Sequence, residues 1–251
     1  MDKLKLKDKI SGSVYGYVLG DATFKQFSKV ENVDSRKIVN DFKCDTTFNT
    51  DLMLCVTETI LKFDGEDKPS IDDVDEGEFY RAILHDKKFL YIMGNNAFDC
   101  NSYYGVALAC IIATRPELAM KISSRGCSLW FMRDVKRLSK ALEFLYSGNT
   151  SEGVTKALEM ASDVFKSPFD VTGPYDNGVD FTLDESFKSS MVKVLRSVNS
   201  SSRAALAGSI VGAKVGLSNL PFKMIKNVPS DKKELLGKFV NQMVDHRLQI
   251  V

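Results

Sequence analysis

The sequence predicts an all-α fold, a compact orthogonal bundle of helices, from three observations. Apolar residues recur at helical spacing along most of the 251 residues, whereas strand-like alternation is rare. Glycines repeat every fourth residue in two places, which puts each set on one face of a helix. The chain shows no internal repeat and no long linker. Its length therefore suits a single domain over residues 1–251 with one sizeable core.

Turn signals divide the first half of the chain into predicted helices. The clearest helix is Asp51 to Lys62, where apolar side chains such as Leu52, Val56 and Ile60 share one face. Residues 64–78 hold eight acids, one proline and two glycines, which is typical of a loop, and their spacing does not match a calcium-binding EF-hand. In chain order, we expect helices over residues 8–22, 51–62, 79–93 (ending at Gly94-Asn95-Asn96) and 102–114, the last a strongly apolar core helix.

The second half continues the helical pattern around one long turn-rich segment. That segment, SPFDVTGPYDNG, covers residues 167–178 and combines prolines, glycines and aspartates. Amphipathic spacing flanks it on both sides. In chain order, we expect helices over residues 132–146, 151–166, 185–197, 203–217 and 231–246.

Two glycine ladders are the least ordinary feature of the predicted helices. The first comprises Gly12, Gly16 and Gly20, and the second comprises Gly208, Gly212 and Gly216. Glycine costs roughly 1 kcal/mol per helical position relative to alanine, so an ordered set needs a compensating gain. Close approach of another backbone or of a ligand would supply that gain, whereas a glycine at a turn or a helix end would need none.

Composition and charge exclude several classes of protein. The formal net charge is +1, so no global field attracts nucleic acid or an anionic membrane, although a local basic site is compatible with it. The five cysteines form no CxxC pair, which suits a reducing compartment. No signal-peptide pattern and no run of 18 apolar residues occurs. We therefore expect a soluble cytoplasmic protein with no membrane and no nucleic acid among its partners.

Four segments, in order, resemble the ADP-ribosylglycohydrolase superfamily. They are ISGSVYGYVLGDA (10–22), TFNTDLML (47–54), GNNAFDC (94–100) and the long stretch from ESFKSS to SNLP (185–221). The last is the most specific, because it combines an amphipathic helix, a polar loop and a Gly/Ala-rich helix that ends before a proline. The resemblance implies that family's compact all-α fold and a site for an ADP-ribose-type nucleotide.

The chain departs from that family at the positions that carry its chemistry. Family members hold two magnesium ions with aspartates from two motifs, and the ions activate water. In this chain the corresponding positions carry Phe48, Asn49, Asn199 and Ser201. Magnesium usually needs carboxylates in its shell. We therefore expect no metal, no cofactor and no catalytic residue of the family type.

Other acids could restore hydrolysis only through a change of register. Asp45 and Asp51 flank the first motif, and Gln26 is the nearest counterpart of an early glutamate typical of active members. A two-metal centre needs several acids at once. Hydrolysis with rearranged ligands is therefore the less favoured alternative.

The altered motifs could still bind a nucleotide. Asn199-Ser200-Ser201-Ser202 supplies N-cap residues for the second glycine-bearing helix, whose N-terminus favours phosphate. Arg203 could bind phosphate, or could be an exposed arginine on a capped helix. Aromatic residues such as Phe98, Tyr103 and Tyr175 could stack on a base, or could be core and loop anchors. The candidate ligand-binding residues are Thr47, Asn49, Asn95, Asn96, Phe98, Tyr103, Tyr175, Asn199, Ser200, Ser201, Ser202 and Arg203.

These observations favour a catalytically degenerate protein that binds an ADP-ribose-type nucleotide, to sequester or sense it, without metal-dependent hydrolysis. Two alternatives stay open. One is an interaction protein with a vestigial pocket, whose partner is another protein and whose Phe48 fills the former metal cavity. The other is an active ADP-ribosyl hydrolase with rearranged ligands.

Overall fold

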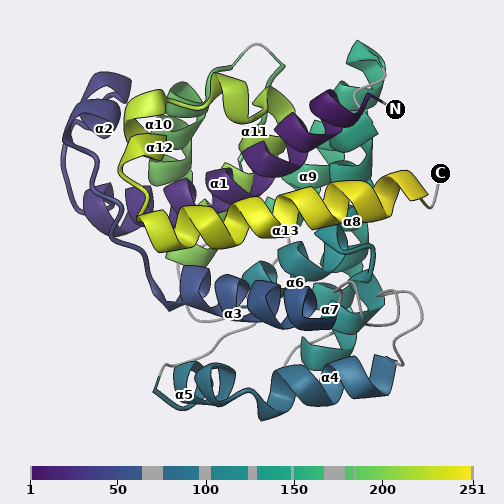
Figure 1. The fold of residues 1–251 in the computed structure, drawn as a ribbon. Helices are drawn as coiled ribbons and strands as arrows, with labels where there is room; N and C mark the ends of the chain where they lie inside the picture. The colour runs from purple at the N-terminus through teal and green to yellow at the C-terminus, as the bar shows by residue number, and fades with distance from the viewer. Residues whose placement is uncertain are drawn as a thin grey trace.

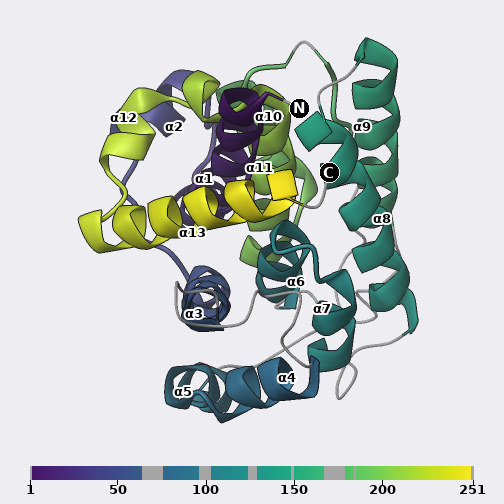
Figure 2. The same ribbon diagram turned by 45° about the vertical axis from the view of Figure 1, so that its right-hand side comes forward.

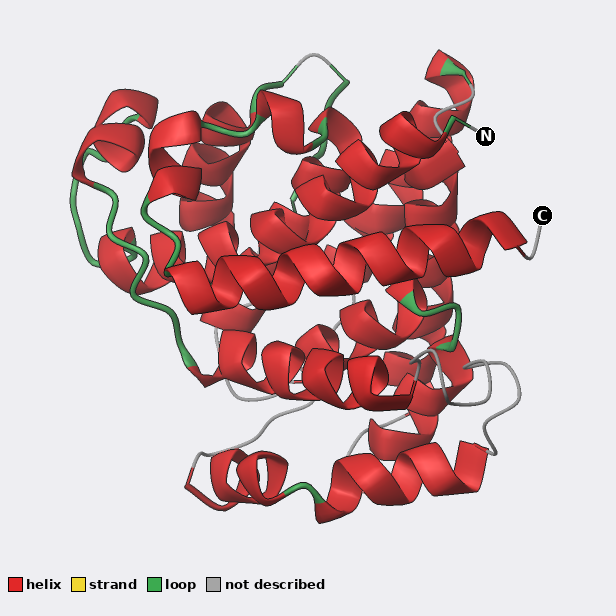
Figure 3. Ribbon diagram, in the orientation of Figure 1, coloured by secondary structure: helices red, strands yellow, loops and turns green. Residues whose placement is uncertain are grey.

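Helices alone form the regular structure of the computed structural model, which describes residues 2–63, 76–95, 103–123, 129–147, 150–166, 179–183 and 185–249 (Figure 3). Within these ranges there are thirteen α-helices, one short 3-10 helix and no strand, which confirms the all-α prediction. In chain order the elements are α1 (Lys3–Phe27), α2 (Ser35–Asp41), α3 (Phe48–Phe63), α4 (Glu76–His85), α5 (Lys87–Asn95), α6 (Tyr104–Ile112), α7 (Pro116–Ser123), α8 (Leu129–Ser147), α9 (Ser151–Phe165), α10 (Phe187–Ser197), α11 (Ser201–Val215), η2 (Leu217–Asn219), α12 (Phe222–Lys226) and α13 (Ser230–Gln249).

The two glycine ladders pack against each other. A Cβ atom added to Gly12 would lie 2.2 Å from the carbonyl oxygen of Gly212, and one added to Gly20 would lie 2.4 Å from that of Ala204. Gly12, early in α1, meets Gly212, late in α11, whereas Gly20, later in α1, meets Ala204, earlier in α11. The two helices therefore run antiparallel. Gly216 also lies at this contact, since a Cβ atom on Gly12 would be 2.8 Å from its carbonyl carbon, and it ends α11 with a φ of 84°. The ladders therefore serve close packing of helix backbones, and the last glycine also serves a helix end.

The remaining helices surround this central pair. Helix α13 packs on α1 and on α3, and α3 in turn packs on α6. In both views α4 and α5 lie at the lower edge beyond α3, while α8 and α9 form the opposite flank from α2 (Figures 1 and 2). The buried core includes large side chains from several of these elements, among them Tyr17, Leu52, Phe131, Phe187 and Phe239.

Side-chain caps begin several helices where the sequence places Asp, Ser or Thr. Asp2 accepts the backbone N–H of Leu4 at 3.0 Å, and Thr150 accepts that of Gly153 at 3.0 Å. Ser200 accepts the N–H of Arg203 at 3.4 Å and is the N-cap of α11. The predicted capping of the second glycine-bearing helix is thus confirmed.

Several predicted boundaries were wrong. The expected helix over residues 79–93 is two helices, because Asp86 leaves the helix and its Oδ1 accepts the N–H groups of Lys88 (2.8 Å) and Phe89 (3.0 Å) at the start of α5. The expected loop over residues 64–78 is wrong at its end, since α4 begins at Glu76. Helix α5 continues to Asn95, through part of the expected stop signal.

The prediction also omitted three short helices. Helix α2 has an Asp34 cap, while α7 begins at Pro116 and α12 directly follows Pro221. Proline is favoured at the first turn of a helix as well as in loops, so its presence alone did not distinguish the two. Among the described residues, no helix is long and apolar enough to cross a membrane.

Candidate ligand-binding site

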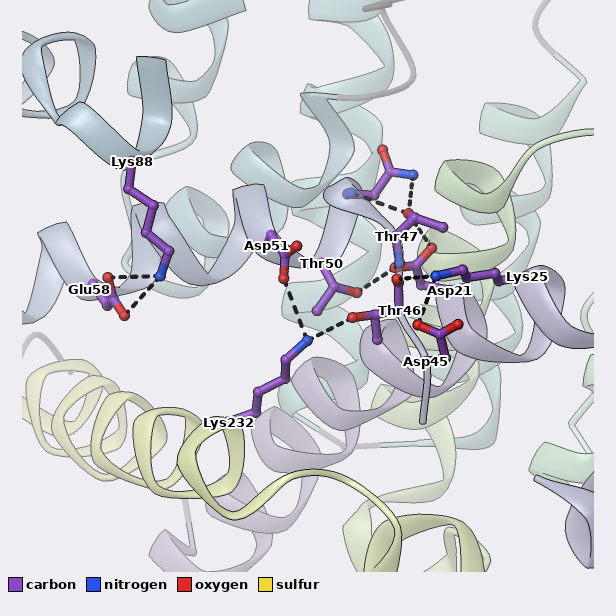
Figure 4. A network of polar contacts seen from close by, with 11 residues as sticks. Asp21, Lys25, Asp45, Thr46, Thr47, Thr50, Asp51, Glu58, Lys88 and Lys232 are labelled. Atoms are coloured by element: carbon purple, nitrogen blue, oxygen red, sulfur yellow. Dashed lines mark hydrogen bonds and ion pairs between the residues drawn. The ribbon is translucent and has the colours of Figure 1, made fainter. Parts of the chain in front are cut away.

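A buried carboxylate joins α1 to the beginning of α3. Asp21 is fully buried near the end of the first glycine ladder. It accepts three hydrogen bonds: from the backbone N–H of Thr47 at 2.8 Å, from Thr47 Oγ1 at 2.7 Å and from Thr50 Oγ1 at 2.6 Å (Figure 4). Three donors converging on one group match an ionised carboxylate, which only accepts hydrogen bonds.

Two opposing effects set the pKa of Asp21. Burial raises it above the ordinary value of 3.8, because desolvation disfavours the charged form. The hydrogen bonds from Thr50 and Thr47 act in the other direction, and burial is the larger effect. Burial also raises the pKa of the neighbouring Tyr17 hydroxyl well above its usual value, with the charge of Asp21 as a second cause.

Asn49 extends this network to the beginning of α11. Its Nδ2 donates to Thr47 Oγ1 at 2.9 Å and to Ser201 Oγ at 2.9 Å. The side chain is 2% exposed. Asn49 and Ser201, which are 152 positions apart in the sequence, are therefore in direct contact. They occupy two of the four positions at which members of the resembled family carry aspartates.

The direction of each hydrogen bond in the network follows from Asp21. Thr47 Oγ1 gives its proton to the carboxylate, so it can only accept from Asn49. This requires the Asn49 amide nitrogen, not the oxygen, to face Thr47. The second Nδ2 hydrogen then occupies a lone pair of Ser201 Oγ, which leaves the Ser201 hydroxyl proton to point elsewhere.

The Asn49–Ser201 end of the network thus offers one donor and one acceptor. The donor is the Ser201 hydroxyl, which is half-buried. The acceptor is Asn49 Oδ1, a buried atom without a hydrogen-bond partner among the described residues. A buried amide oxygen that lacks a donor costs about 1–3 kcal/mol, so the site is suited to receive a hydroxyl or another polar group.

The other predicted residues around the start of α11, from Asn199 to Arg203, differ in how far they are buried. Asn199 is exposed, and Ser200 Oγ lies 3.2 Å from the Oγ of buried Ser202. Arg203 is 2% exposed, so the alternative of an exposed arginine is wrong. Its Nη2 donates to the carbonyl oxygen of Phe165 at 2.7 Å, and its guanidinium lies 5.4 Å from the centroid of that ring. A phosphate could reach Arg203 only after neighbouring groups moved.

Two further predicted residues, Asn95 and Tyr103, have other contacts. Asn95 is exposed and donates to the carbonyl oxygen of Tyr91 at 2.7 Å. Tyr103 is almost fully buried, with its ring centroid 6.4 Å from that of Phe131 in an edge-to-face arrangement. Asn96, Phe98 and Tyr175 lie outside the described residues.

Asp21 is the residue of this site that our sequence reasoning missed. A usable signal existed, because Asp21 is the only charged residue between Lys9 and Lys25, within an otherwise apolar and small-residue stretch. A lone acid in a buried helix is seldom left without partners. The hydroxyls of Thr47 and Thr50 were the nearby partners, but only the fold reveals that contact.

The donor set of the network does not fit a magnesium centre of the family type. Asn49 and Ser201 carry no charge and bond to each other. The nearby acids are engaged elsewhere: Asp45 pairs with Lys25 at 2.7 Å, and Asp51 lies 3.5 Å from Lys232 (Figure 4). Over the part of the chain that the structure describes, no group of three or more His, Cys, Asp and Glu side chains could hold a metal.

The remaining positions of the metal motifs have structural contacts. Phe48, the first residue of α3, is half-buried and packs against the core. Gln26, the nearest counterpart of the family's early glutamate, donates to the carbonyl oxygen of Asp41 at 2.7 Å and accepts the N–H of Lys43 at 2.8 Å. It thus holds the segment that follows α2.

In comparisons with known proteins, no protein-family model and no curated protein matches the chain.

Proposed function

We propose that this chain is a catalytically degenerate protein of the ADP-ribosylglycohydrolase type that binds an ADP-ribose-type nucleotide without metal-dependent hydrolysis. The binding group is the network of Asp21, Thr47, Asn49 and Ser201. The observation that carries the proposal is the contact between Asn49 Nδ2 and Ser201 Oγ, because it leaves Asn49 Oδ1 as a buried acceptor without a partner and the hydroxyl proton of half-buried Ser201 as a donor.

A sugar hydroxyl matches this donor and acceptor pair. A ribose carries neighbouring hydroxyls, each able to donate and to accept. Once neighbouring groups move to expose the buried Asn49 Oδ1, one hydroxyl could donate to it while another accepts from Ser201. The nucleotide's phosphates would meet no strong repulsion from the network, because its one carboxylate, that of Asp21, is covered by three donors. Binding would therefore need no cation between the ligand and the protein.

Calorimetric titration with ADP-ribose, in magnesium and in EDTA, tests this proposal. We expect binding that is unchanged by EDTA, with the ligand recovered intact. Ser201→Ala removes the hydroxyl donor and should weaken binding by about three- to tenfold, the value of one hydrogen bond. The exposed Ser28→Ala is the matched control and should have no effect.

Two other outcomes would contradict the proposal in different ways. Binding that requires magnesium, or release of ribose products, would indicate the enzyme with rearranged ligands. Absence of any binding would favour the interaction protein with a vestigial pocket. One observation already favours that second candidate over the enzyme: the direct Asn49–Ser201 contact occupies the place where carboxylates would hold a metal.

A further inference from the structure

Residues of α8 and α9 line a groove. These two helices lie on the flank of the molecule away from α2 (Figures 1 and 2). The volume of the groove is about 690 Å³, and its lining includes Lys140, Glu143 and Phe144 from α8 and Lys156 and Met160 from α9. This volume lies within the range of protein binding sites. None of its lining residues belongs to the Asn49–Ser201 network.

The centre of the groove is apolar and partly open. Phe144 is 38% exposed, which is unusual for a side chain of this size, and Met160 beside it is half-buried. The Lys156 ammonium lies 5.9 Å from the centroid of the Phe144 ring. An accessible aromatic ring bordered by polar groups is the usual anatomy of the central contact in a protein interface.

The free charges of the groove are positive. Glu143 is already neutralised, because both of its carboxylate oxygens accept from Arg247 Nη1, at 2.8 and 3.0 Å. Lys140 and Lys156 therefore dominate the rim. Lys136 and Arg137 extend this charge along α8, and within the described ranges neither they nor Lys140 makes a hydrogen bond or ion pair.

The acids of α9 limit the kind of partner. Glu152, Glu159 and Asp163 are exposed on the same helix but do not line the groove. A continuous polyanion such as a nucleic acid would meet these carboxylates as well as the lysines. A peptide can place its carboxylates opposite the lysines alone and an apolar side chain over Phe144.

We infer that this groove is a docking surface for an acidic amphipathic segment of a partner protein. An apolar anchor of that segment packs on Phe144 and Met160, and its Asp or Glu side chains pair with Lys140 and Lys156. This follows the general mode in which an amphipathic helix lies in a groove. The inference does not depend on nucleotide binding, so either can fail without the other.

Fluorescence anisotropy with two labelled model peptides tests the inference. Both are helical, have the same length and carry one leucine face. One bears glutamates at the positions that flank this face, and the other bears lysines at the same positions. We expect only the acidic peptide to bind, and to bind less tightly as salt increases. Lys140→Glu with Lys156→Glu should weaken that binding by about tenfold or more, since two attractive contacts become repulsive.

The matched control is Lys29→Glu with Lys43→Glu. It makes the same change in net charge at exposed positions that flank α2, on the far side of the molecule (Figure 1). Phe144→Ser tests the apolar contact separately and should also weaken binding. Equal binding of the two peptides, no binding of the acidic one, or equal losses in the groove and control variants would overturn the inference.

Discussion

Gly16 and Gly208 approach each other so closely that neither has room for a side chain. A Cβ atom on Gly16 would lie 2.2 Å from the carbonyl oxygen of Gly208, and a Cβ atom on Gly208 would lie 2.2 Å from that of Gly16. Both obstacles are backbone atoms, which cannot rotate away. The separation of α1 and α11 is therefore set by these glycines, and the Asp21 network at one end of the contact depends on that separation.

Gly16→Ala should destabilise the protein by about 2 kcal/mol or more, because the helices must separate to admit the methyl group. The intrinsic gain in helix propensity, about 1 kcal/mol, is too small to offset this cost. Urea unfolding measures the difference. Gly237→Ala on α13 is the matched control, because nothing lies within 4 Å of its added Cβ atom, and it should be neutral or stabilising. A Gly16→Ala variant as stable as the control would show that the helices are not packed this closely.

The glycines also show what could be predicted from the sequence. The four-residue spacing of Gly12 and Gly16 predicted close approach, and the amphipathic pattern located most of the long helices. Nothing local indicated that the partner of Gly12 was Gly212, because that pairing is a property of the fold. The same holds for Asn49 and Ser201: both were predicted site residues, but their direct contact depends on how α1 and α11 bring their neighbours together. The break at Asp86 was missed for a different reason, since an aspartate is acceptable both inside a helix and at its N-cap.

Asp21→Asn should destabilise the protein by about 1–3 kcal/mol, although it removes a buried charge. An asparagine presents one NH₂ group where the carboxylate presented an oxygen, and all three contacts at this site are donors. If the amide oxygen keeps the contacts of Oδ2, its NH₂ group faces Thr47 Oγ1, which must then accept from residue 21 and compete with Asn49. Chemical denaturation of Asp21→Asn and of the exposed control Asp45→Asn measures the effect. Equal stability of the two variants would contradict the proposed direction of the network.

The stability contributed by Asp21 should fall as the pH rises above about 4. The pKa of Asp21 is raised in the folded state, mainly by burial. At pH values between the ordinary pKa of 3.8 and the raised one, the folded protein therefore binds more protons than the unfolded chain. Stability decreases with pH wherever the folded state holds more protons. The test compares the unfolding free energies of the wild type and of Asp21→Asn from pH 4 to pH 7. We expect the difference to favour the wild type most at low pH and to level off above the raised pKa. A difference that grew with pH would show that the hydrogen bonds, not burial, dominate.

Replacing Asn49 and Ser201 together by aspartates should create a site for a divalent cation. The two side chains are in contact at 2.9 Å, so two carboxylates there would repel each other and one would bind a proton more tightly. Magnesium or calcium would relieve this repulsion, and binding to the folded state alone raises the unfolding temperature. We expect the melting temperature of the double variant to rise on addition of either cation and to fall again with EDTA, while the wild type shows no such response. Asn40→Asp with Ser151→Asp, at exposed positions on α2 and α9, controls for the added charge. A wild-type protein stabilised to the same extent would mean that the neutral site already binds the cation, whereas a variant indifferent to both cations would mean that the two positions cannot act as joint ligands.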